Sequence, residues 1–144
     1  MNLIKMARKI KLRDNSKAQT NTASCRYYIR LTSKFSVKLY DQKGERDDIV
    51  KKQRMACVHG IAPIALCKVN INGYYGYITE HADTITGLTF EEVDELKIKM
   101  RELKLCTGDI GRYWNSGLIN NRPVSIDFDS VSVGNTILRN KKKK

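Results

Sequence analysis

Hydrophobic and polar positions alternate early in the chain, as they do in a half-buried strand. Residues 26–31 and 35–40 are rich in Tyr, Ile, Phe and Val, and the polar tripeptide between them is typical of a hairpin turn. After Gly44, the acidic pair Asp47 and Asp48 predicts the start of a helix, because the helix dipole favours negative charge there. One side of this helix carries Ile49, Gln53, Ala56 and Cys57.

Gly60 and Pro63 predict the end of that helix, and from residue 64 the hydrophobic period changes to two. Asn72 and Gly73 form a two-residue signal for a type I′ turn, so residues 64–71 and 74–79 are expected to pair as a second hairpin. This turn is the strongest local signal in the chain.

A second helix is predicted to begin after Thr89, because Glu92 three residues later completes a capping box. Its apolar stripe has the spacing of one helix face and consists of Val93, Leu96, Met100 and Leu103. Residues 106–115 have no regular pattern.

Two short strands are expected around Asn120-Asn121, at 118–119 and 124–128. In the second strand Val124, Ile126 and Phe128 would face inward, and Ser125 and Asp127 outward. Hairpins alternating with single helices indicate an α+β fold with a mainly antiparallel sheet.

The composition is that of an ordinary globular domain. The 144 residues are 41% hydrophobic and 29% charged, and no apolar run approaches the ~18 residues that a membrane span needs. We therefore expect a cytoplasmic protein that does not contact membranes. Its four cysteines are scattered without a C-x-x-C pair, which argues against a zinc site.

The net charge of +12 is concentrated at the two ends of the chain. Residues 1–17 carry +5 and residues 139–144, which include Lys141 to Lys144, carry another +5, so the body is nearly neutral. We expect a basic flexible segment at 1–21, one domain at 22–138 and a basic tail at 139–144. Such ends attract nucleic acid, acidic proteins or anionic lipid without sequence specificity, or serve only solubility.

Two further segments carry residues suited to chemistry. Lys38 stands between apolar neighbours in the middle of a predicted strand, and Asp109, Asn115 and Asp127 follow the second helix. Taken alone, a mid-strand lysine is usually solvated and a loop aspartate usually forms a turn.

In this order the residues resemble the protein-kinase-like fold, and most closely the short divergent kinase-like proteins of bacteriophages. The matching stretches are 26–40, 59–63, 76–80 and 115–129. The resemblance implies a truncated domain: an N-lobe-type antiparallel sheet with one helix, and a second lobe reduced to one helix and a catalytic-type hairpin. It also implies the host cytoplasm as the location of a phage-encoded protein.

The resemblance assigns a role to each matching residue. Lys38 would hold the phosphates of ATP and assist catalysis, and Glu80 would lie at the hinge against adenine. Asp109 would orient the acceptor hydroxyl, while Asn115 and Asp127 would bind magnesium. Phosphoryl transfer needs these groups more than covalent catalysis, because positioning and charge stabilisation supply most of the rate.

Departures from the kinase pattern keep other functions open. No glycine-rich loop precedes Lys38, the helix carboxylate could be Glu45, Asp47 or Asp48, and only fifteen residues follow Asp129. The sequence therefore predicts a minimal ATP- and Mg-dependent phosphotransferase resembling a protein Ser/Thr kinase. The alternatives are an inactive kinase-like protein that binds and modulates a host protein, and a basic nucleic-acid-binding module using its tails and strand tyrosines.

Overall fold

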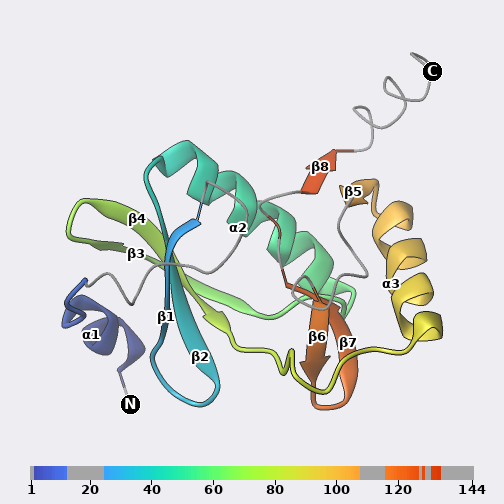
Figure 1. Ribbon diagram of the computed structural model, residues 1–144. Helices are drawn as coiled ribbons and strands as arrows, with labels where there is room; N and C mark the ends of the chain where they lie inside the picture. Colours follow the sequence, from blue (N-terminus) through green and yellow to red (C-terminus); the bar gives the residue numbers. More distant parts are fainter. Residues whose placement is uncertain (1, 13–24, 108–115, 127, 129–130, 134–144) are drawn as a thin grey trace. The chain divides into compact units, whose positions relative to one another are not determined.

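The computed structural model describes residues 2–12, 25–107, 116–126, 128 and 131–133 (Figure 1). The chain divides into two compact units, and one of the three boundaries between their segments falls within a helix. Unit 1 comprises Met1–Lys51 and Ile64–His81, and unit 2 comprises Lys52–Pro63 and Ala82–Lys144.

Unit 1 is built on a four-stranded antiparallel sheet whose strand order is β1-β2-β4-β3. Its strands are β1 (Cys25–Arg30), β2 (Phe35–Tyr40), β3 (Ala65–Ile71) and β4 (Tyr74–Glu80). Both predicted hairpins are confirmed. Asn72 and Gly73 have φ angles of 50° and 83°, as a type I′ turn requires, and the turn joining β1 to β2 closes where the N–H groups of Leu31 and Thr32 donate to the Phe35 carbonyl.

One face of this sheet carries the core of unit 1. Val37, Leu39 and Ile78 are fully buried there, together with Ala7 from helix α1 (Leu3–Arg8). This helix differs from the expected flexible segment at 1–21. Its apolar stretch is too short to signal a helix by itself, and it gains its stability by covering the apolar face of the sheet.

Helix α2 (Lys43–Val58) begins four residues earlier than the acidic pair Asp47-Asp48 indicates. The first helical bond runs from the Arg46 N–H to the Gln42 carbonyl, and Gly44 lies in the first turn with open space around it. A glycine costs least at a helix end, so it did not stop the helix here. The inward side was predicted correctly in part: Ile49, Gln53 and Ala56 are buried, and Cys57 is half-buried.

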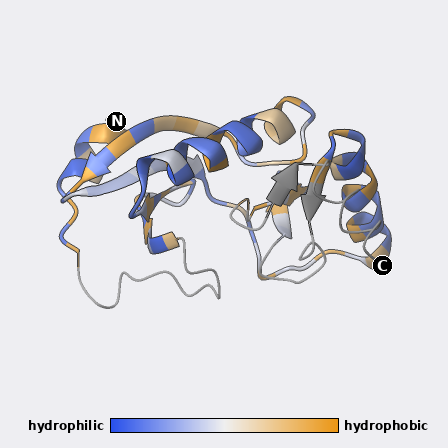
Figure 2. Ribbon diagram, turned by 90° about the horizontal axis from the view of Figure 1, so that it is seen from above, coloured by the Kyte–Doolittle hydropathy of each residue, from blue (hydrophilic) through white to orange (hydrophobic). Residues whose placement is uncertain are grey.

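Unit 2 contains helix α3 (Phe90–Glu102), whose predicted capping box is present. The Thr89 hydroxyl accepts from the Glu92 N–H at 3.1 Å, and the Glu92 carboxylate accepts from the Thr89 N–H at 2.9 Å. Leu96 and Met100 are buried, as the stripe indicates. The alternation of hydrophobic and hydrophilic residues along the helices can be followed in Figure 2.

Two small strand pairs complete the described part of unit 2. They consist of β6 (Ser116–Ile119) with β7 (Arg122–Ser125), and β5 (Leu105–Thr107) with β8 (Val131–Val133). The turn at Asn120-Asn121 is confirmed, because both residues have positive φ angles, 51° and 63°. The pairing of β5 with β8 was not predicted, since residues this far apart leave no local signal.

The predicted alternation after Val124 is wrong at Ser125. Val124 and Phe128 are buried as expected, but Ser125 is 1% exposed instead of facing outward. Its N–H donates to the Ile61 carbonyl at 2.8 Å, so the end of β7 is covered by the chain that follows α2. A second strand-like contact joins Asp83 to Leu118 through reciprocal 2.9 Å bonds.

Candidate functional site

Lys38 lies in the middle of β2, on the face of the sheet opposite to the apolar core. The register places Lys38 between Tyr28 on β1 and Tyr77 on β4, and Tyr77 in turn opposite Lys68 on β3. Because side chains of directly opposed residues point to the same face, these four residues form one row across the sheet. Lys38 is half-buried, while Tyr77 is fully buried.

A cluster of polar side chains surrounds Lys38, and we refer to Tyr28, Ser36, Lys38 and His81 as the Lys38 cluster. The Lys38 ammonium lies 5.9 Å from the centre of the Tyr28 ring. The Tyr28 hydroxyl is 2.7 Å from Nδ1 of His81, and the Ser36 hydroxyl is 3.1 Å from the same nitrogen. All four residues belong to unit 1.

The backbone fixes His81 where β4 ends. Its N–H donates to the Lys34 carbonyl at 2.6 Å, so the residue continues the antiparallel pairing of β4 with the start of β2. The ring then contacts Ser36 on β2 and reaches across to Tyr28 on β1. His81 therefore connects three of the four strands through two side chains and one backbone bond.

The chemistry of the Lys38 cluster suits an anion. An ammonium is a point charge with three donors, and phenol, alcohol and imidazole groups add further hydrogen-bonding capacity beside it. A cation about 6 Å from a ring centre is also held there by the ring quadrupole. The cluster can thus present a positive charge in a set position on the sheet.

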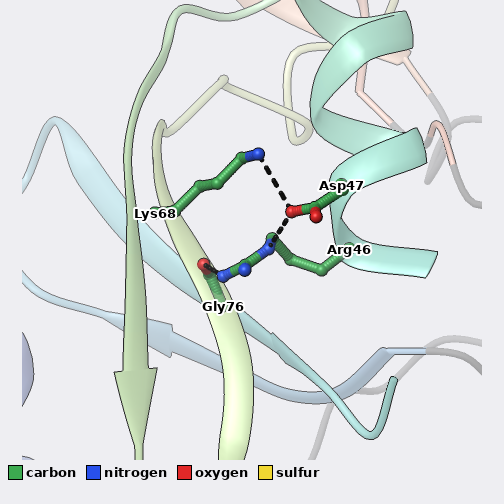
Figure 3. A network of polar contacts seen from close by, with 4 residues as sticks. All are labelled: Arg46, Asp47, Lys68 and Gly76. Carbon is green, nitrogen blue, oxygen red and sulfur yellow. Dashed lines mark hydrogen bonds and ion pairs between the residues drawn. The ribbon is translucent and has the colours of Figure 1, made fainter. Parts of the chain in front are cut away.

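Asp47, one of the carboxylates at the start of α2, pairs with Lys68 of β3. Figure 3 shows Asp47 between Lys68 of β3 and Arg46 of α2, at 2.9 Å and 2.7 Å, while Arg46 donates to the Gly76 carbonyl at 2.8 Å. Hydrogen bonds from Lys68 and then Arg46 lower the pKa of the Asp47 carboxyl. Asp47 therefore links the start of α2 to β3 through Lys68.

Glu80, the expected hinge residue, is the last residue of β4, and its carboxylate makes a structural hydrogen bond. Its carboxylate accepts from the Ile64 N–H at 2.9 Å, and its own N–H donates to the Ile64 carbonyl at 3.0 Å. This pair of bonds ties the end of β4 to the residue that precedes β3. The Glu80 side chain thus holds the sheet together at the position that the resemblance assigns to adenine.

The remaining predicted residues, Asp109, Asn115 and Asp127, lie outside the described residues. The acceptor-orienting and magnesium-binding roles stay predictions. In the described part of the chain, no three His, Cys, Asp or Glu side chains gather in a way that could hold a metal ion. None of the described helices is both long and apolar enough to cross a membrane.

Sequence reasoning did not assign His81 or Ser36 to the site, and it considered Tyr28 only as a residue that could stack on bases. The register of the first hairpin could have identified Tyr28, because a turn at 31–34 places Tyr28 opposite Lys38. His81 is found by extending β4 one residue beyond Glu80, next to the start of β2.

Comparisons with known proteins add little. No family model matches the sequence, and no curated protein is significantly similar to it. Among solved structures, the chain is similar to WbdD, in a co-crystal structure with the kinase inhibitor LY294002, at 12% identity and a TM-score of 0.45. The match covers 88% of this chain and 38% of that one, and at this level it identifies neither a family nor an activity.

Proposed function

We propose that the chain is a reduced kinase-like phosphotransferase in which Lys38 binds the phosphates of ATP. In this proposal Asn115 and Asp127 hold Mg²⁺, which neutralises phosphate charge, and Asp109 orients the accepting hydroxyl of a protein substrate. The single observation that carries the proposal is the setting of Lys38: a half-buried cation in the middle of the sheet, with its ammonium over the Tyr28 ring.

The order of the elements in unit 1 supports the same proposal. Two strands, a helix and two strands follow each other, and the sheet order β1-β2-β4-β3 puts the Lys38 strand next to the strand that ends at Glu80. This arrangement is compatible with the N-lobe-type antiparallel sheet with one helix that the resemblance implies. It brings the lysine and the hinge segment to neighbouring strands of one sheet.

Thermal unfolding with MgATP tests the proposal most directly. A ligand that binds only the folded state at a hundredfold excess over its Kd adds about 2.7 kcal/mol of stability, which is a rise in Tm of about 5–10 °C for a chain of this size. Lys38→Met should reduce ATP affinity about 10- to 100-fold, because a hydrogen-bonded charge contact is lost.

Lys51→Ala is the matched control, since Lys51 is an exposed lysine on α2 of the same unit. It should bind MgATP as the parent chain does. A Tm that stays constant at millimolar ATP, with either Mg²⁺ or Mn²⁺, would remove both the kinase and the nucleotide-binding proposals.

A protein-binding function is the second candidate, and one feature of unit 2 favours it. Ile85 is 95% exposed and Phe90 is 92% exposed, and Ile98 on the same helix as Phe90 is 50% exposed. Exposed large apolar side chains can serve as contacts for a partner protein. If ATP does not bind, an inactive kinase-like protein that uses these side chains to bind a host protein becomes the better account.

A further inference from the structure

His81, which follows the end of β4, is linked to Lys38 on β2 through Tyr28 on β1. The contacts run in sequence: Nδ1 of His81 lies 2.7 Å from the Tyr28 hydroxyl, and the Tyr28 ring lies beneath the Lys38 ammonium. The edge strand β1, which carries Tyr28, is paired within the sheet only with β2. The contact with His81 therefore adds a side-chain restraint where the backbone pairing is one-sided.

The hydrogen bond has a preferred direction. A phenol hydroxyl is a good donor and a poorer acceptor, because its oxygen lone pair is delocalised into the ring. Donation from Tyr28 to Nδ1 then requires the neutral imidazole to carry its hydrogen on Nε2. The Ser36 hydroxyl, fully buried and 3.1 Å from Nδ1, is compatible with this tautomer, since a hydroxyl can donate as well as accept.

We propose that His81 is a positioning residue for Lys38, acting through Tyr28. The imidazole fixes the phenol hydroxyl, the fixed ring helps to set the place where the ammonium rests, and that place determines how the ammonium meets an anion. The part of the inference that concerns ligand affinity rests on the proposed function, because it takes the phosphates of ATP as the anion. The part that concerns Lys38 itself does not.

The test uses substitutions that remove these contacts one at a time, at Tyr28 and at His81. Tyr28→Phe removes the hydroxyl and keeps the ring, whereas Tyr28→Leu removes both. His81→Ala removes the acceptor, and His81→Asn restores it, because the amide oxygen of Asn occupies nearly the place of Nδ1.

Tyr75→Phe is the matched control. Tyr75 is half-buried on the same sheet face, with the Arg46 guanidinium 5.8 Å from its ring centre. In the described part of the chain its hydroxyl makes no hydrogen bond, so the same chemical change should leave Lys38 undisturbed.

The first readout is NMR of the full chain without ligand. Only His59 and His81 are present, so the ring nitrogens are assigned with His59→Gln, and Nδ1 of His81 should show the shift of an unprotonated acceptor at neutral pH. Protons next to the Lys38 ammonium should be shifted upfield by the Tyr28 ring. That shift should fall in His81→Ala and Tyr28→Phe, vanish in Tyr28→Leu, and return in His81→Asn.

The second readout is MgATP affinity. Tyr28→Phe and His81→Ala should each weaken it about two- to tenfold, the effect of one hydrogen bond, with recovery in His81→Asn. A Lys38 shift that is the same in His81→Ala as in the parent chain would overturn the inference. If the NMR pattern is found but ATP does not bind, the positioning role stands and the proposed function fails.

If His81→Ala does not fold, Tyr28→Phe decides the matter, because a Phe at this half-buried position keeps the ring packing. An upfield shift of Lys38 that is undiminished in Tyr28→Phe would show that the hydroxyl contact with His81 does not position the lysine.

Discussion

A buried charge at the start of α2 is the feature of unit 1 that most needs compensation. Arg46 is only 4% exposed, and its guanidinium is satisfied by the Gly76 carbonyl and the Asp47 carboxylate, with the Tyr75 ring nearby. Asp47 pairs with both Arg46 and Lys68, so two cations share one carboxylate. Losing it would leave a buried cation with a backbone carbonyl as its remaining polar partner in this network.

Asp47→Asn should reduce the free energy of unfolding at neutral pH. It should also make that free energy fall less steeply as the pH is lowered. The folded-state pKa of Asp47 is lowered, so the folded chain binds fewer protons than the unfolded chain. The contribution of Asp47 to the free energy of unfolding is thus complete above its ordinary pKa of 3.8. It is lost as the pH falls through the lower pKa that Asp47 has in the folded chain. Urea unfolding at pH 7, 5, 4 and 3 measures this.

Asp94→Asn is the control for that series, since Asp94 is an exposed aspartate on α3. A parent chain and Asp47→Asn variant that lose stability in parallel below pH 4 would show that the Asp47 network contributes nothing to the folding energy.

At the scale of the elements, Gly76 lies where the backbone of β4 passes close to β2. A Cβ there would collide with Cδ2 of Leu39 and would lie 2.5 Å from the Lys38 carbonyl oxygen. The second of these atoms is backbone and cannot move without disturbing β2. The carbonyl of Gly76 is also the acceptor for Arg46, so the sheet and α2 both depend on this position.

Gly76→Ala should therefore destabilise the chain by about 1–3 kcal/mol, the usual range for forcing an atom into a packed interior. Gly44→Ala is the opposite case, since nothing lies within 4 Å of the added methyl in the first turn of α2. It should be neutral or stabilising by up to about 1 kcal/mol. Chemical denaturation of both variants gives the comparison, and equal effects would contradict this account of Gly76.

The elements that the sequence predicts well are those whose signal lies within a few neighbouring residues. The Asn72-Gly73 turn and the Thr89 capping box are each complete within a few residues, and both are present. Helix α1 and the pairing of β5 with β8 depend on distant surfaces, so no local pattern indicated them. For the same reason the sequence singled out Lys38 but not its neighbours, which only the strand register brings together.

At the scale of the whole molecule, charge and packing are separated along the chain. The three basic side chains of the first nine residues, Lys5, Arg8 and Lys9, are exposed, whereas Ala7 of α1 is buried. The other concentration of charge, at 139–144, lies outside the described residues. Charge can therefore be removed at the N-terminal end without opening the core of unit 1.

Deleting Lys141–Lys144 and changing Lys5, Arg8 and Lys9 to Gln should abolish binding to heparin or duplex DNA while leaving Tm within about 2 °C. Electrostatic attachment to a polyanion grows with the number of cations that replace its counterions, so losing seven of them removes most of the affinity. Salt titrations of DNA binding give that number as the slope. A trimmed chain that still binds DNA with a steep slope would place the binding surface on the body of the protein, and the Lys38 face of the sheet would then be the first region to examine by substitution.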